Sequence, residues 1–190
     1  RLAPVVIPHW DGGENLAIAD SKTLYTTAVG LERLELGLHT VLHMMRRAPQ
    51  TWTELVSILD ADSDGRRAQL PWHQNYECQL PVSAAESRLF DLGKRLQEQC
   101  NRAGAIPVRL RARLVFPAEF NDLVEYYGSK GAALSHVTLS LVRELVDLLK
   151  TSHGSSQTAD SVDPDTPAML IVCDKHGARN RYMDLLKHHF

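Results

Sequence analysis

The sequence contains few cysteines and few aromatic residues. Its 190 residues include three cysteines, and aromatic residues make up 6% of the chain. The cysteines are far apart, odd in number and outside any metal-binding spacing such as Cys-x-x-Cys. This excludes a disulfide-rich secreted scaffold and favours a reducing compartment, so we expect a cytoplasmic protein.

Charge of one sign and long apolar runs are also lacking. A formal net charge of −2 argues against a protein that coats nucleic acid with its whole surface, although a local basic groove stays compatible with it. No apolar run is long enough to span a membrane, and the N-terminus has no signal-peptide pattern. A glycine-rich phosphate loop is absent as well. We expect no membrane partner.

What is present predicts one domain, residues 1–190, with a sizeable core, because 44% of the residues are hydrophobic. The spacing of apolar residues predicts four helices, over residues 28–45, 84–101, 117–127 and 129–150. We interpret residues 46–81 as an insertion and residues 151–167 as a mobile loop. Within the insertion, the aspartates between Asp60 and Gly65 predict an exposed turn, because arginines follow where a calcium loop needs oxygen ligands.

Two segments have the patterns of strands. Residues 106–116 alternate apolar side chains with arginines, which predicts a strand whose basic face either follows a phosphate backbone or, the interpretation that we favour, forms a solvated sheet edge. Residues 168–173 form an almost continuous apolar run, which is typical of a strand buried on both faces. Together the patterns predict the α/β class, with a parallel or mixed sheet covered by helices.

Asp174 ends the second of these apolar runs, and Arg179 and Arg181 follow closely. In α/β sheets, polar groups just beyond the carboxyl end of a strand are where ligands usually bind. A carboxylate with basic neighbours there indicates a metal or phosphate site. An equally good interpretation is that Asp174 caps the following helix and that the arginines are solvated.

A second candidate is the stretch Asp20-Ser21-Lys22. Aspartate before serine predicts a helix N-cap, and an exposed cap beside a lysine can also hold an anion. Most stretches of this kind are caps and nothing more.

Four stretches resemble motifs of the type 2 ribonuclease H (ribonuclease HII) family, and they occur in the same order. They are Asp20-Ser-Lys-x-Leu24, Pro117-Ala-Glu-Phe-Asn121, the helix from Ser129 with Ala133, Leu139 and Arg143-Glu-Leu145, and Leu170-Ile-Val-Cys-Asp174. The resemblance covers most of the chain apart from residues 46–81. It implies a ribonuclease H-like mixed sheet flanked by helices.

The family's opening Asp-Glu-x-Gly-Arg-Gly motif and its last aspartate are missing. We therefore expect the chain to be either a fragment, incomplete at both ends, or a relative that has lost the site. The fragment alone is expected to be inactive.

The resemblance implies a metal-dependent endonuclease that hydrolyses the RNA of RNA–DNA hybrids or ribonucleotides embedded in DNA. Two Mg²⁺ or Mn²⁺ ions would activate water and stabilise the leaving 3′ oxygen, with Asp174 as a ligand. Ser21 and Lys22 would bind a substrate phosphate, and Arg179 and Arg181, by position, would neutralise backbone charge.

Two other classes of function stay open. One is a non-catalytic nucleic-acid-binding or scaffold module on the same fold, because a fold does not dictate an activity. The other is an unrelated α/β enzyme with a phosphate site at Asp174.

Overall fold

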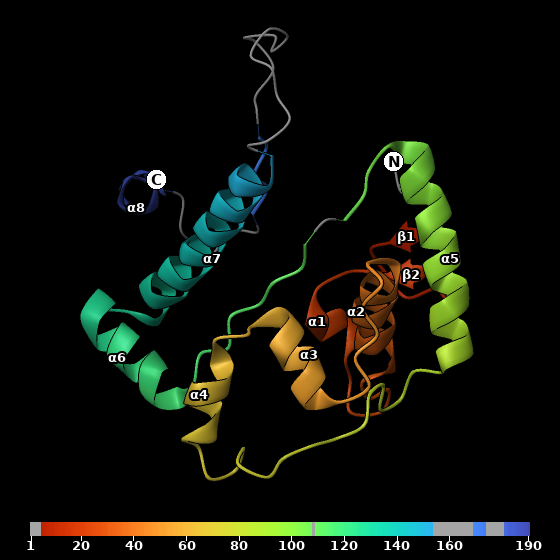
Figure 1. Cartoon of the computed structure of the whole chain (residues 1–190), viewed down its shortest axis with the longest axis horizontal. Helices are drawn as coiled ribbons and strands as arrows, with labels where there is room; N and C mark the ends of the chain where they lie inside the picture. Colours follow the sequence, from red (N-terminus) through yellow and green to blue (C-terminus); the bar gives the residue numbers. More distant parts are fainter. Residues whose placement is uncertain (1–4, 108, 154–168, 174–180) are drawn as a thin grey trace, which may run out of the picture. The chain divides into compact units, whose positions relative to one another are not determined.

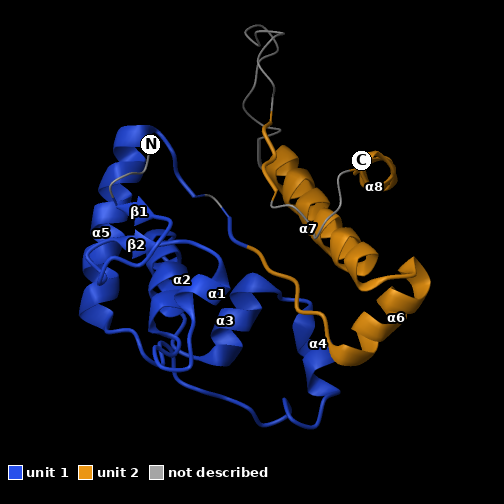
Figure 2. Ribbon diagram, turned by 180° about the vertical axis from the view of Figure 1, so that it is seen from behind, with its two compact units in different colours: residues 1–110 blue, residues 111–190 orange. Residues whose placement is uncertain are grey.

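The computed structural model describes residues 5–107, 109–153, 169–173 and 181–190. The chain divides into two compact units, residues 1–110 and 111–190 (Figure 2). Each unit is described by itself below. The single domain predicted from the sequence stays a prediction.

The first unit contains a small parallel sheet of two short strands, β1 (Val6–Ile7) and β2 (Leu16–Ala17). Val6 pairs with Leu16, and Ile7 pairs with Ala17. Together with the helices, this sheet confirms the α/β class in its broad sense among the described residues (Figure 1). Its strands are much shorter than those that the sequence predicts.

The loop between the two strands is tightly organised. The carboxylate of Asp11 accepts hydrogen bonds from the backbone N–H of Gly13 at 3.1 Å and from the side chain of Asn15 at 2.7 Å. Arg88 donates to the carbonyl of Gly13. Gly13 has a φ of +91°, and a Cβ there would lie 1.4 Å from the Arg88 guanidinium. Glycine suits this position, because it adopts the left-handed backbone without strain and leaves room for the arginine.

The helices α2 (Glu32–Met44) and α5 (Glu86–Ala103) form most of the core of this unit. Both confirm predicted helices. Their apolar faces pack with the sheet into one buried cluster that contains Val5, Leu16, Leu36, Ala84, Leu89, Leu92, Leu96 and Cys100. Burial of such side chains is the main driving force for the formation of this unit.

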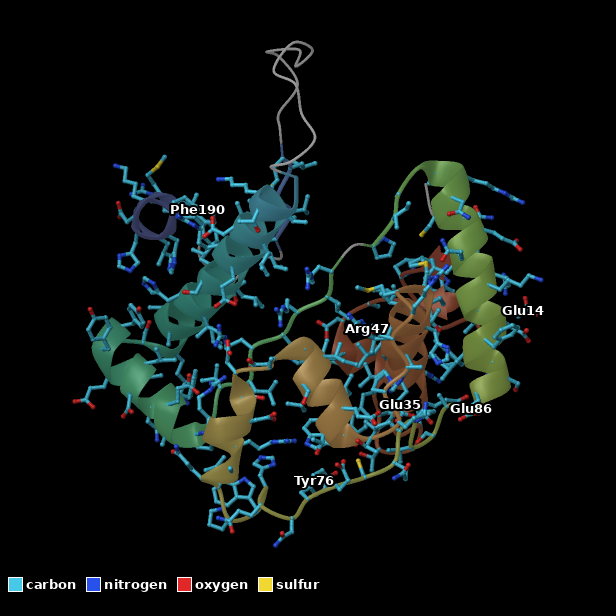
Figure 3. All side chains as sticks on the ribbon, in the orientation of Figure 1. Glu14, Glu35, Arg47, Tyr76, Glu86 and Phe190 are labelled. Carbon is cyan, nitrogen blue, oxygen red and sulfur yellow. The ribbon has the colours of Figure 1, made fainter. Side chains whose placement is uncertain are left out.

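A single buried carboxylate ties α2 to the segment that leads into α5. Glu35, which is labelled in Figure 3, is 7% exposed and accepts backbone N–H bonds from three consecutive residues: Val82 at 2.6 Å, Ser83 at 2.7 Å and Ala84 at 2.9 Å. Hydrogen bonds to a charged acceptor are stronger than those between neutral groups. Glu35 therefore fixes where the chain enters α5.

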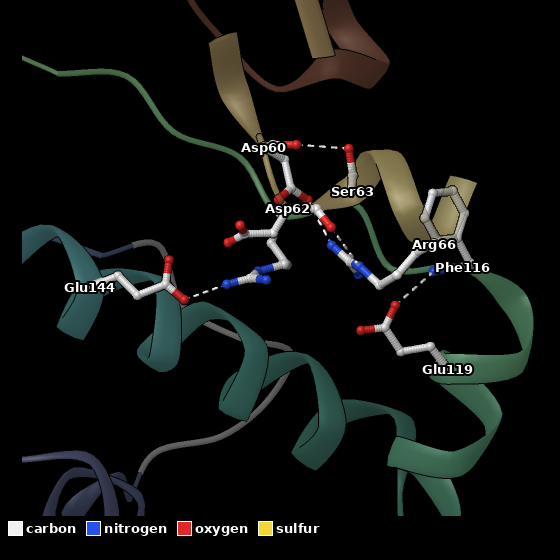
Figure 4. Close-up of polar contacts among 8 residues, drawn as sticks. Asp60, Asp62, Ser63, Arg66, Phe116, Glu119 and Glu144 are labelled. Atoms are coloured by element: carbon white, nitrogen blue, oxygen red, sulfur yellow. Dashed lines mark hydrogen bonds and ion pairs between the residues drawn. The ribbon is translucent and has the colours of Figure 1, made fainter. Parts of the chain in front are cut away.

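The segment predicted as an insertion contains two helices, α3 (Trp52–Leu59) and α4 (Ser63–Ala68). The exposed turn predicted from Asp60 to Gly65 is confirmed only in part, because Ala61 and Asp62 form an exposed turn whereas Ser63 already begins α4. Asp60 is 4% exposed and Ser63 is fully buried. The Asp60 carboxylate forms an ion pair with Arg66 at 3.1 Å, and the backbone carbonyl of Asp60 accepts a hydrogen bond from the Ser63 hydroxyl at 2.7 Å (Figure 4). The arginine that argued against a calcium loop is the partner that allows this aspartate to be buried.

His39 gives this unit a predictable response to pH. Its side chain is 2% exposed, and burial lowers its pKa below the usual 6.5. Neighbouring His43 lowers this pKa as well, whereas Glu35 raises it. As the pH falls, His39 is therefore protonated near pH 6.5 in the unfolded chain but only at lower pH in the folded chain. The stability due to neutral His39 is complete above pH 6.5 and is lost as the pH falls toward the folded pKa.

We expect His39→Leu to weaken the loss of stability between about pH 7.5 and pH 5.5. For one titrating group, the free energy of unfolding changes by at most about 1.4 kcal/mol per pH unit. The measurement is urea unfolding of both proteins at both pH values, with a substitution of another exposed histidine of the same unit, His9→Leu, as control. Equal pH dependence in wild type and His39→Leu would contradict this account.

The second unit contains α6 (Pro117–Tyr127), α7 (Lys130–His153) and α8 (Met183–His189). The first two confirm predicted helices. Pro117 occupies the first helical position of α6, and Gly128 ends this helix with a φ of +75°. Residues 151–153, which the sequence assigned to a mobile loop, continue α7. The rest of that loop, residues 154–167, lies outside the described residues.

Both long strand predictions are wrong for the residues that the structure describes. Residues 109–116 form no strand, and neither do residues 169–173. The second segment was expected to be buried on both faces, yet Leu170 is 81% exposed and Val172 is 83% exposed. A strand is stable only when a neighbouring strand satisfies its backbone groups, and side-chain alternation says nothing about that partner.

Among the described helices, none is both long and apolar enough to cross a membrane.

Candidate functional site

The stretch Asp20-Ser21-Lys22 begins α1 (Ser21–Leu24), as its sequence predicts. The Asp20 carboxylate accepts the backbone N–H of Lys22 at 2.8 Å, which confirms its role as an N-cap. The side chains of Ser21 and Lys22 are exposed. The structure thus presents a hydroxyl and an ammonium group next to each other in solvent, where both can donate to an anion.

The basic and acidic residues predicted around the C-terminal apolar run are only partly described. Asp174 and Arg179 lie outside the described residues. Arg181 is exposed and directly precedes Tyr182, the N-cap residue of α8. Ser21 and Lys22 belong to the first unit, whereas Arg181 belongs to the second.

The run before Asp174 is not the buried strand that made this aspartate a candidate. Residues 169–172 include Leu170 and Val172, which are among the most exposed apolar side chains of the chain. The described residues that precede Asp174 are therefore exposed and do not form a buried strand. What remains for Asp174 is the resemblance in sequence.

The arginines of residues 109–113 differ in their surroundings. Arg109 is exposed, whereas Arg111 is half-buried. Arg113 forms an ion pair with Glu144 of α7 (Figure 4). That pair favours a structural role for Arg113 over contact with a phosphate backbone.

A hard cation such as Mg²⁺ needs a cluster of oxygen ligands. The described residues contain one group of three or more possible metal ligands, and its members are the imidazoles His136, His188 and His189. Imidazole suits zinc and other transition metals better than Mg²⁺. The one such group among the described residues therefore offers nitrogen rather than oxygen ligands.

This histidine cluster was missed in the sequence. His136 lies on α7, and His189 follows 53 positions later on α8. The adjacent pair His188-His189 is the only local signal, and no ligand spacing links it to His136. Only the packing of α8 on α7 brings the three rings together.

A shallow pocket of about 330 Å³ lies between α2 and α5 in the first unit. Phe90 of α5 is 66% exposed and lines this pocket. The other lining residues include His43, Met44, Arg46, Gly93, Lys94 and Gln97. The lining thus combines two cationic side chains, Arg46 and Lys94, with apolar ones.

Burial and the neighbouring His188 lower the pKa of His189. This imidazole is therefore mostly neutral at pH 7, which is the form that binds metals.

No protein-family model matches the chain, and neither a curated protein nor a solved structure is significantly similar to it.

Proposed function

We propose that the chain is part of a metal-dependent endonuclease of the ribonuclease HII type, which acts in the cytoplasm on RNA–DNA hybrids or on ribonucleotides embedded in DNA. The observation that carries the proposal is the order of the four motifs that resemble this family. A ribonuclease H-like fold is part of the same proposal.

The local structure at these motifs also supports the proposal. Asp20 caps α1, which leaves the Ser21 hydroxyl and the Lys22 ammonium free to meet a phosphate. Pro117 begins α6, and the Glu119 carboxylate accepts the backbone N–H of Phe116 at 3.4 Å. The long helix α7 follows directly.

Each residue has a proposed role that its chemistry permits. Ser21 and Lys22 bind a phosphate of the substrate, since a hydroxyl and an ammonium are both hydrogen-bond donors. Arg179 and Arg181 neutralise backbone charge. Asp174 binds Mg²⁺ or Mn²⁺ together with further carboxylates, because one aspartate cannot satisfy a hard divalent ion.

The experiment compares a labelled RNA–DNA hybrid, a DNA duplex with one ribonucleotide and an all-DNA duplex, using the protein at its full natural length. We expect cleavage of at least one ribonucleotide-containing substrate with Mg²⁺ or Mn²⁺, none of the all-DNA duplex, and none in EDTA. Salt-dependent binding without cleavage would replace the nuclease by the non-catalytic binding module. Absence of both binding and cleavage would contradict the nuclease and the binding module alike.

Lys22→Ala tests the proposed phosphate contact. Hybrid binding should weaken, and the slope of log K against log salt should become shallower by about one. The measurement is fluorescence anisotropy in EDTA at several salt concentrations. The control is Lys94→Ala, which removes another exposed lysine of the same unit. An unchanged slope for Lys22→Ala would remove this residue from the interface.

A further inference from the structure

Three imidazole rings converge where α8 packs on α7 in the second unit. The ligand atoms of His136, His188 and His189 all lie within 4.8 Å of one another. The Nδ1 of His136 is 2.8 Å from the Nε2 of His189. Ring centroids are 5.0 Å apart for His136 and His188, 4.9 Å for His136 and His189, and 5.0 Å for His188 and His189.

This convergence is unusual for adjacent helical residues. Successive side chains on a helix point about 100° apart. His188 and His189 nevertheless both have a ligand atom close to His136. The rings of His188 and His189 meet that of His136 at interplanar angles of 87° and 52°.

The first ring of the cluster is held in place by its neighbours. The ring of Tyr127 stacks on that of His136, with centroids 3.7 Å apart and planes 13° from parallel. This stacking restricts the rotation of the His136 ring. A restricted ring lowers the entropy cost of binding an ion.

Helix α8, which carries His188 and His189, depends on a few contacts for its position. A helix of seven residues is not stable alone. Leu185 buries its side chain, and Arg143 of α7 donates to the carbonyl of His189 at 2.8 Å. The Arg143 guanidinium also lies over the ring of Phe190, 5.9 Å from its centroid. These contacts position both histidines, and an ion shared with His136 would strengthen the attachment.

We propose that His136, His188 and His189 bind one Zn²⁺ ion, which fastens α8 to α7. Three histidines with a fourth position for water are a known zinc ligand set, with Zn–N distances of about 2.0–2.1 Å. Tetrahedral geometry at that distance separates the nitrogens by about 3.3 Å. The nitrogens of His136 and His189 need to move apart by only a few tenths of an ångström to reach it. This proposal does not depend on the nuclease proposal, because its donors are nitrogens rather than carboxylates.

The test is a Co²⁺ titration of the full-length protein, purified without a polyhistidine tag and freed of metal by chelation. Tetrahedral Co²⁺ absorbs strongly in the visible range and reports binding directly. We expect one equivalent to bind and Zn²⁺ to displace it. His188→Gln and His189→Gln should each weaken binding at least about 10-fold. His43→Gln, an exposed histidine of α2, should leave binding unchanged.

A second readout separates metal binding from folding. At a Zn²⁺ concentration of about 100 times the dissociation constant, hydrogen exchange of the α8 amides should slow up to about 100-fold in wild type, and not in His188→Gln. His188 is exposed, so this variant is expected to fold, which circular dichroism checks.

Absence of tetrahedral absorption in folded wild-type protein would overturn the proposal. The close pair His136 and His189 would then be a hydrogen bond between two imidazoles. Unchanged Co²⁺ binding in both His188→Gln and His189→Gln would overturn it equally.

Discussion

Replacing Glu35 by alanine should lower the free energy of unfolding of the first unit by about 2–3 kcal/mol. The carboxylate is 7% exposed and accepts three consecutive backbone N–H groups, those of Val82, Ser83 and Ala84. Alanine leaves all three without this acceptor. Water can replace it at the exposed residues Val82 and Ser83, but less readily at buried Ala84. The expected loss in free energy of unfolding is therefore only a few kcal/mol.

Two companion variants separate the role of Glu35 from general effects. Glu35→Gln keeps one carbonyl oxygen but loses the charge and one acceptor, so its effect should lie between wild type and alanine. Glu98→Ala removes an exposed glutamate of α5 and should change stability by no more than about 0.5 kcal/mol.

Urea unfolding measures the free energies, and hydrogen exchange at residues 82–84 measures the local effect. Exchange there should accelerate in Glu35→Ala and stay unchanged in Glu98→Ala. Equal stability losses in the two alanine variants would show that the three hydrogen bonds contribute nothing.

The helices could be predicted because their signals are local. The helix predicted over residues 117–127 matches α6, Pro117–Tyr127, because a proline suits the first helical position and Gly128 adopts the left-handed backbone that ends a helix. Asp20 was recognisable as an N-cap for the same reason, since its partner is the N–H of Lys22 two residues later.

The strands could not be predicted because their stability depends on a partner elsewhere in the chain. The alternation of residues 106–116 and the apolar run of residues 169–173 have the composition of strands. Yet the described sheet pairs Val6 with Leu16 and Ile7 with Ala17, in segments with weak strand signals. Composition indicates which residues suit a sheet, and only the pairing decides which ones form it.

The same limit applies to the sites. Glu35 is linked to Val82 across 47 positions, and His136 to His189 across 53. Both links follow from the packing of one helix against another segment, which no local spacing encodes. Histidine pairs in a sequence are common, so His188-His189 alone indicates no ligand set.

Asp174→Asn should reduce divalent-dependent cleavage of an RNA–DNA hybrid by at least about 100-fold in the full-length protein. Asparagine has the same shape but no negative charge, and a hard divalent ion prefers carboxylate oxygens. Because only the ligand charge changes, folding and hybrid binding in EDTA should stay close to those of wild type.

Asp184→Asn is the matched control. Asp184 is an exposed aspartate in the first turn of α8, in the same unit as Asp174. It has no proposed part in the reaction. Its replacement should leave cleavage within about threefold of wild type.

The rate of hybrid cleavage by wild type, Asp174→Asn and Asp184→Asn in saturating Mg²⁺ or Mn²⁺ tests the proposed nuclease most directly. The account predicts activity in wild type and Asp184→Asn, and its loss in Asp174→Asn. Equal cleavage by all three folded proteins would contradict the assignment of Asp174 as a metal ligand and, with it, the ribonuclease HII proposal.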